Sequence, residues 1–73
     1  MINYGFFLRK LAKKIIHERK IKKLTQDQLA TLSEIDRTYI ARIENGKANP
    51  TIKILNKICK ILKIKLYKLF REI

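Results

Sequence analysis

Residue types that would indicate disulfides, a metal site or catalysis are scarce in this chain of 73 residues. Cys59 is the only cysteine, which excludes a disulfide within one chain. His17 is the only histidine, so these two residues supply no ligand set for a structural metal. No Ser/His/Asp, Cys/His or paired-carboxylate arrangement suited to catalysis is present. We therefore expect a protein that is not an enzyme and that uses neither a metal nor a cofactor.

Patterns of strands, linkers and membrane spans are missing as well. Valine is absent, and aromatic and threonine residues never alternate with polar ones as they would in a half-buried strand. One proline and two glycines leave no linker-like stretch. The longest apolar run, at residues 5–8, is too short for a membrane span or a secretory signal core. The sequence predicts one all-helical domain over residues 1–73, located in the cytoplasm.

Acidic residues are few: 6 Asp and Glu stand against 18 Lys and Arg, for a formal net charge of +12. Such a charge attracts polyanions, and the two obvious classes are nucleic acid and anionic membrane. The chain is also short, and a domain of this size buries only roughly 60% of its extended-state surface. We therefore expect association with a second subunit to stabilise the fold.

Apolar residues recur at three- and four-residue spacing in five segments. We expect helices over about residues 6–22, 26–32, 36–46, 52–62 and 66–72. Thr25 precedes the second segment, and Gln28 completes a capping box with it. Asp36 and Thr51 are the expected N-caps of the third and fourth helices. Gly46 ends the third helix as a left-handed C-terminal residue.

The second and third expected helices, within about residues 26–44, have the pattern of a helix-turn-helix. Ala30 is the small residue at their crossing, and the hydrophobic residues that fix this crossing are Leu29, Ile35, Ile40 and Ile43. In this motif the N-terminal residues of the second helix meet base edges in the major groove. Arg37 and Thr38 stand there, and Arg42 follows within one further turn. A helix dipole disfavours a cation at that end, so Arg37 indicates recognition.

The C-terminal part, about residues 52–73, has more apolar residues than one internal face requires. Those expected to face the core are Ile52, Leu55, Ile58, Cys59 and Leu62. The additional ones are Ile54, Ile61, Leu66, Leu69, Phe70 and Ile73. An uncovered apolar stripe marks a partner surface, and a two-fold axis would let two copies cover each other. We therefore predict that these additional residues form a homodimer interface.

Three stretches, "LTQDQLA", "DRTYIARIENGK" and "NPT", resemble the Cro/cI-like helix-turn-helix repressors, and most closely the controller proteins of restriction-modification systems. The resemblance covers about residues 11–71. It implies a five-helix, lambda-repressor-like DNA-binding domain. It further implies a transcriptional regulator that binds a roughly palindromic DNA operator as a homodimer and contacts RNA polymerase when it activates. No membrane or small-molecule substrate is implied.

The resemblance also assigns roles to individual residues. Those implied to contact bases are Arg37, Thr38 and Arg42. Those implied to contact the DNA backbone are Gln26, Tyr39, Lys47, Asn49 and Thr51. Arg19 and Glu44 match a partly buried salt bridge that ties the first helix to the third. The chain departs from the family at Glu34, where the turn glycine is common and a left-handed residue carries strain of about 1–2 kcal/mol. It also departs at Lys23, which replaces a common glycine before the second helix.

Two other functions remain open at this point. Within DNA binding, a phage-type repressor or the antitoxin of a toxin–antitoxin pair would share the same motifs. Outside it, lysine-rich amphipathic helices bind anionic bilayers, so a cationic membrane-active protein is the alternative. The helix caps, the stop at Gly46 and the acids Asp36 and Glu44 at motif positions favour the compact DNA-binding domain.

Overall fold

The computed structural model describes residues 4–71, which form five α-helices and no strand. The helices are α1 (Tyr4–Ile21), α2 (Gln26–Ser33), α3 (Arg37–Glu44), α4 (Ile52–Leu62) and α5 (Leu66–Phe70). This confirms the all-helical fold expected from the sequence. The first helix starts two residues earlier than expected, at Tyr4 instead of residue 6. The fifth ends at Phe70, and residue 72, its expected end, lies outside the described residues.

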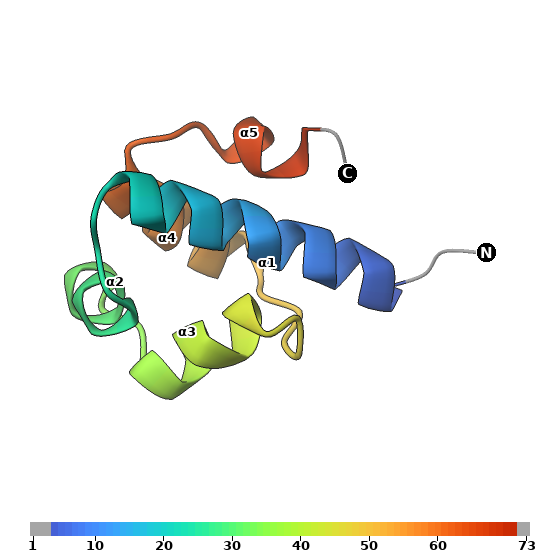
Figure 1. Ribbon diagram of the computed structural model, residues 1–73, viewed down its shortest axis with the longest axis horizontal. Coiled ribbons are helices and arrows are strands. Elements are labelled where there is room, and N and C mark those ends of the chain that lie inside the picture. Colours follow the sequence, from blue (N-terminus) through green and yellow to red (C-terminus); the bar gives the residue numbers. More distant parts are fainter. Residues whose placement is uncertain (1–3, 72–73) are drawn as a thin grey trace.

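The long helix α1 organises the fold (Figure 1). It runs along the long axis of the molecule, with α5 on one side and α3 on the other. Helix α1 packs against α3 and α5, α2 packs against α3 and α4, and α4 packs against α5. The whole measures 36 × 23 × 20 Å. The arrangement leaves α3 and the start of α2 on one edge, away from α5.

The core is made mostly of the residues that the helical spacing predicts. Every residue of the predicted helix-turn-helix crossing is at most 8% exposed: Leu29, Ala30, Ile35, Ile40 and Ile43. Ile15 of α1 and Ile58 and Leu62 of α4 are fully buried beside them. Ile52, expected in the same face of α4, is instead 55% exposed. It is the first residue of α4, directly after the loop.

Four helices end in the same kind of turn, although only one uses glycine. Lys23, Glu34 and Lys63 have φ of 57–58°, and Gly46 has φ of 70°. Each of the three non-glycine turns closes with a backbone hydrogen bond: Leu24 N–H to Arg19 O (3.1 Å), Ile35 N–H to Ala30 O (3.0 Å) and Ile64 N–H to Cys59 O (3.2 Å). The donors in these bonds are apolar residues that pack on the core. Apolar packing directly after the turn offsets the left-handed strain at Lys23 and Glu34.

All three predicted N-cap residues precede the first residue of their helices, and two of them make side-chain capping hydrogen bonds. The capping box is formed: Gln28 N–H donates to Thr25 Oγ1, and Thr25 N–H donates to Gln28 Oε1. Thr51 Oγ1 accepts from the N–H of Ile54 at 3.2 Å. Asp36 is the N-cap residue of α3, as expected, but its side chain makes no capping hydrogen bond. Its carbonyl oxygen already accepts from the N–H of Tyr39, one of the groups that a side-chain cap would satisfy.

Candidate nucleic-acid interface

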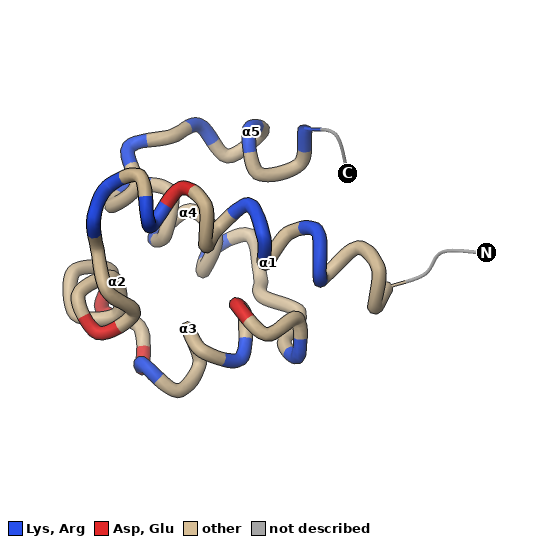
Figure 2. Tube along the Cα trace, viewed as in Figure 1, with Lys and Arg blue, Asp and Glu red and all other residues tan. Residues whose placement is uncertain are grey.

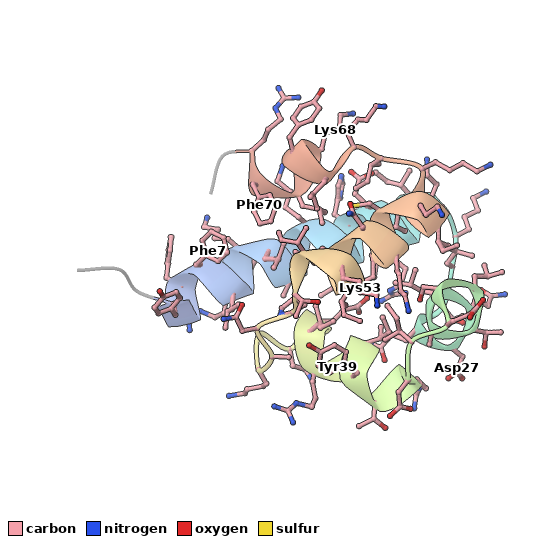
Figure 3. All side chains as sticks on the ribbon, turned by 180° about the vertical axis from the view of Figure 1, so that it is seen from behind. Phe7, Asp27, Tyr39, Lys53, Lys68 and Phe70 are labelled. Atoms are coloured by element: carbon pink, nitrogen blue, oxygen red, sulfur yellow. The ribbon has the colours of Figure 1, made fainter. Side chains whose placement is uncertain are left out.

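The first turn of α3 presents two polar side chains to solvent. Arg37 and Thr38 are both exposed, as expected for residues that read DNA. Tyr39 differs, because it is half-buried and packs against the hydrophobic core. Figure 3 places Tyr39 on the same edge of the molecule as Asp27, which stands in the first turn of α2. This edge brings together the starts of both helices of the motif.

Arg37 has a partner that the sequence analysis missed. Its Nε lies 2.7 Å from Oδ1 of Asp27, and the two side chains are 62% and 73% exposed. The ion pair connects the start of α3 to the start of α2. No local signal in the sequence indicates this contact, because the two residues are 10 positions apart and belong to different helices.

Glu44 is the centre of a buried polar network at the end of α3. Its carboxylate accepts hydrogen bonds from Arg19 Nε (2.7 Å), Arg19 Nη2 (3.0 Å) and Gln26 Nε2 (2.9 Å). Arg19 Nη1 also donates to the carbonyl oxygen of Leu24 at 2.7 Å. The pair implied between Arg19 and Glu44 is therefore present. The network also fixes Gln26, because one N–H of its amide is directed at Glu44 instead of at solvent.

The loop between α3 and α4 is braced from both sides. Arg42 Nη2 donates to the carbonyl oxygen of Lys47 at 3.1 Å. A Cβ on Gly46 would lie 3.1 Å from Cγ of Arg9 on α1, so the loop lies directly against α1 at this point. The side chains of Lys47 and Asn49 are exposed. The loop is thus held, and its polar side chains face solvent after the end of α3 that is opposite to Arg37.

Lys and Arg residues lie on α1, α3, α4, α5 and the connecting segments but not on α2, whereas the acids of the described residues lie on α1, α2, α3 and the turn between α2 and α3 (Figure 2). From residue 45 to residue 71 the chain has eight basic residues and no acid. A field of this kind attracts the phosphates of DNA over a distance of about one Debye length, about 8–10 Å near physiological salt. It gives no sequence preference by itself.

The predicted dimer surface on α4 and α5 is only partly exposed. Four of its residues are half-buried and pack on the edge of the core: Ile54, Ile61, Leu66 and Phe70. Phe70 also stacks on Phe7 of α1, with ring centroids 6.1 Å apart. Leu69 does not belong to this surface, because it is fully buried. It faces inward since α5 lies flat on α1 and α4. Ile73 lies outside the described residues.

The remaining candidate groups do not form a site. Cys59 is 4% exposed, and burial raises the pKa of its thiol, which favours the unreactive protonated form. Within residues 4–71 no three His, Cys, Asp or Glu side chains are grouped as metal ligands. In the same part of the chain, no helix has the length and apolar character needed to cross a bilayer.

Comparison with known proteins agrees with this geometry. The helix-turn-helix family HTH_3 matches residues 15–69. The control protein C.MunI of a Mycoplasma species is 39% identical over 72 residues, covering 99% of this chain and 89% of that protein. The restriction-modification controller protein C.AhdI from Aeromonas hydrophila superposes with a TM-score of 0.84 at 33% identity, over 86% of this chain and 96% of that one.

A third relative has been solved on DNA. The controller protein C.Esp1396I, as a tetramer with its natural 35-base-pair operator, has a TM-score of 0.81 and is 42% identical to this chain. The superposition covers 89% of this chain and 86% of that one. The chain therefore belongs to the helix-turn-helix family and, within it, to the restriction-modification controller proteins.

Proposed function

We propose that this protein is a homodimeric transcriptional regulator that binds a roughly palindromic operator and controls the genes of a restriction-modification system. The observation that carries the proposal is the start of α3, where Arg37 and Thr38 are exposed on a helix whose other end is fixed to α1 by Arg19 and Glu44. The similar controller protein C.Esp1396I, solved with its natural operator, supports it.

Base readout is assigned to the exposed face of α3. An α-helix with its side chains is about 10–12 Å in diameter, so α3 can enter the major groove, which is about 12 Å wide. Arg37 would donate to the O6 and N7 of a guanine, the commonest specific contact in that groove. Thr38 lies beside Arg37, and Arg42 lies one turn further, on the same face as Thr38.

Variants of a relative add support for this assignment. C.Esp1396I has been solved with single substitutions at an arginine, a threonine and a tyrosine that follow one another in its chain. The Arg-Thr-Tyr run of the present chain is Arg37–Tyr39.

Backbone contacts are assigned to the two flanks of α3. On one side Gln26, the first residue of α2, would donate to a phosphate, and on the other Lys47 and Asn49 would do so from the loop. Tyr39 would add its hydroxyl from the half-buried ring. Thr51 would contact the backbone while capping α4. Contacts of this kind fix the register of a protein on DNA without reading sequence.

Two copies are proposed to join through α4 and α5, along Ile54, Ile61, Leu66 and Phe70. These side chains form the half-buried apolar edge of a domain with a small core of its own. A two-fold axis there would leave both α3 helices facing one side of the DNA duplex, about 34 Å apart, in successive turns of the major groove.

The regulatory output follows from the position of the operator. Bound over a promoter, the dimer would block RNA polymerase; bound beside one, it would recruit the polymerase through a direct contact. A restriction endonuclease gene next to this one would agree with the controller function, whereas a lysis cassette or a small toxin gene would indicate a phage repressor or an antitoxin.

A nuclease footprint upstream of the protein's own gene tests the proposal. At physiological salt we expect protection of two half-sites related by a two-fold axis, and no co-sedimentation with anionic liposomes. Liposome binding without a footprint would contradict it.

A further inference from the structure

The negative charge of Asp27 is unfavourable on a surface proposed to bind DNA. It lies in the first turn of α2, beside Gln26, where its charge would face phosphates. An acid in the first turn is favoured by the helix dipole, and this is the simplest explanation of its presence. The dipole does not explain why Oδ1 of Asp27 lies 2.7 Å from Nε of Arg37, on another helix.

The ion pair has little value for stability. Both side chains are more than half exposed, and such pairs contribute little because water and salt screen them. Instead, the ion pair restricts the orientation of the Arg37 side chain. A free arginine at the start of a helix has many rotamers, whereas one that is held at Nε has few. The fold is held together elsewhere, by the buried network around Glu44.

The atoms used by the pair leave Arg37 able to read a base. The guanidinium has five N–H donors in a planar fork, of which Nε carries one. With Nε beside Asp27, both terminal nitrogens remain for the two acceptors of a guanine. Asp27 can therefore stay in place while Arg37 contacts the base.

We propose that Asp27 is a positioning residue for Arg37 and increases the preference for operator over other DNA. This inference rests on the proposed function, in which Arg37 contacts a base. On the operator, Asp27 keeps its partner and holds the fork in the reading geometry. On other DNA, Arg37 would turn to a phosphate and leave Asp27 unpaired next to the backbone. Repulsion from phosphates therefore opposes non-specific binding more than specific binding.

Binding measurements on five proteins separate positioning from plain charge. The wild type is compared with Asp27→Asn, Arg37→Ala, the double variant and Glu34→Gln, each on the operator and on a random duplex of equal length at one salt concentration. Glu34→Gln is the matched control, because it also removes an exposed negative charge, and no ion pair involves Glu34 within residues 4–71. Thermal unfolding checks that all five proteins fold.

Asp27→Asn should bind random DNA more tightly and lower the ratio of operator to random affinity by about fivefold or more, the lower end of what a bidentate arginine contributes. In the Arg37→Ala background the same change should leave this ratio unaltered. Glu34→Gln should raise both affinities by a common factor. In the free protein, the Nε–H signal of Arg37 should become more mobile by ¹⁵N relaxation when Asp27 is replaced.

Each contrary result has a distinct meaning. If Asp27→Asn raises both affinities by one factor, as Glu34→Gln does, Asp27 is a general charge and the inference is wrong. A higher ratio in Asp27→Asn would also overturn it. If Arg37→Ala itself leaves the ratio unchanged, the assignment of Arg37 to base readout fails, and the inference fails with it.

Discussion

Arg19 and Glu44 are 25 residues apart in sequence and are joined by two hydrogen bonds, from Nε to Oε2 and from Nη2 to Oε1. Their side chains are only 12% and 2% exposed. Because Arg19 belongs to α1 and Glu44 ends α3, the pair sets the position of α3 against the longest helix of the fold. Gln26, the first residue of α2, donates to the same carboxylate and so links the start of α2 to this pair. The position of α3 thus depends on one buried carboxylate.

Glu44→Ala should destabilise the protein by about 3–5 kcal/mol, because it leaves the guanidinium of Arg19 buried without its partner. That loss is comparable with the whole stability of a small domain, at about 0.05–0.15 kcal/mol per residue. Denaturant unfolding followed by circular dichroism measures it. The double variant Arg19→Met with Glu44→Leu should lose less, since no charge remains buried. A loss below about 1 kcal/mol in Glu44→Ala would contradict this account.

Lys63→Gly should stabilise the protein by about 1 kcal/mol, because it removes left-handed strain at φ 58°. In a domain of this size that gain corresponds to a rise in Tm of about 4–8 °C. Lys60→Gly, one turn earlier inside α4, is the matched control and should lose about 1 kcal/mol. The two variants remove the same side chain, so equal changes in Tm would show that backbone strain at Lys63 is negligible.

Operator affinity should fall linearly with the logarithm of salt concentration, with a slope of about −0.9 per phosphate contact. Lys47→Ala should make the slope shallower by about 2 in a dimer, one unit for each copy. Gln26→Ala should weaken binding at every salt concentration without changing the slope, because its amide is neutral. Titrations by fluorescence anisotropy measure both. An unchanged slope in Lys47→Ala would remove Lys47 from the backbone contacts.

Leu66→Glu should dissociate the dimer, because it places a charge on the proposed apolar surface of α5. Leu32→Glu is the control, since Leu32 is 55% exposed and lies on α2, whereas α5 packs against α1 and α4. Phe70 is a poorer choice, because its stacking on Phe7 would be lost as well. Sedimentation velocity gives the oligomeric state. A Leu66→Glu protein that is folded and still dimeric would place the interface elsewhere.

Salt should strengthen the same dimer while it weakens DNA binding. Each chain carries +12, and the part from residue 45 to residue 71 has no acid, so two copies repel each other. The screening length falls from about 10 Å at 0.1 M salt to about 3 Å at 1 M, which reduces this repulsion.

Most of the fold could be predicted from the sequence, because apolar spacing and caps are local signals. Thr25, Thr51 and Gly46 marked helix ends, and Ala30 marked the helix crossing. Spacing could not show which apolar residues the chain's own helices cover. Leu69 was therefore expected on the dimer surface but is buried, and Ile52 was expected in the core but is exposed. At the site, exposed Arg37 and Thr38 were predictable from the motif. The ion pair between Arg37 and Asp27 could not be predicted, because that contact depends on how two separate helices are placed.

The central claim is that α3 reads DNA through Arg37, and one comparison tests it most directly. The affinities of wild type and Arg37→Ala are measured on the footprinted operator and on a random duplex at one salt concentration. We expect Arg37→Ala to lose about 1–3 kcal/mol on the operator and much less on the random duplex, with relaxed preference at one base pair. Equal losses on both duplexes would show that Arg37 contacts phosphate and that α3 does not read sequence through it.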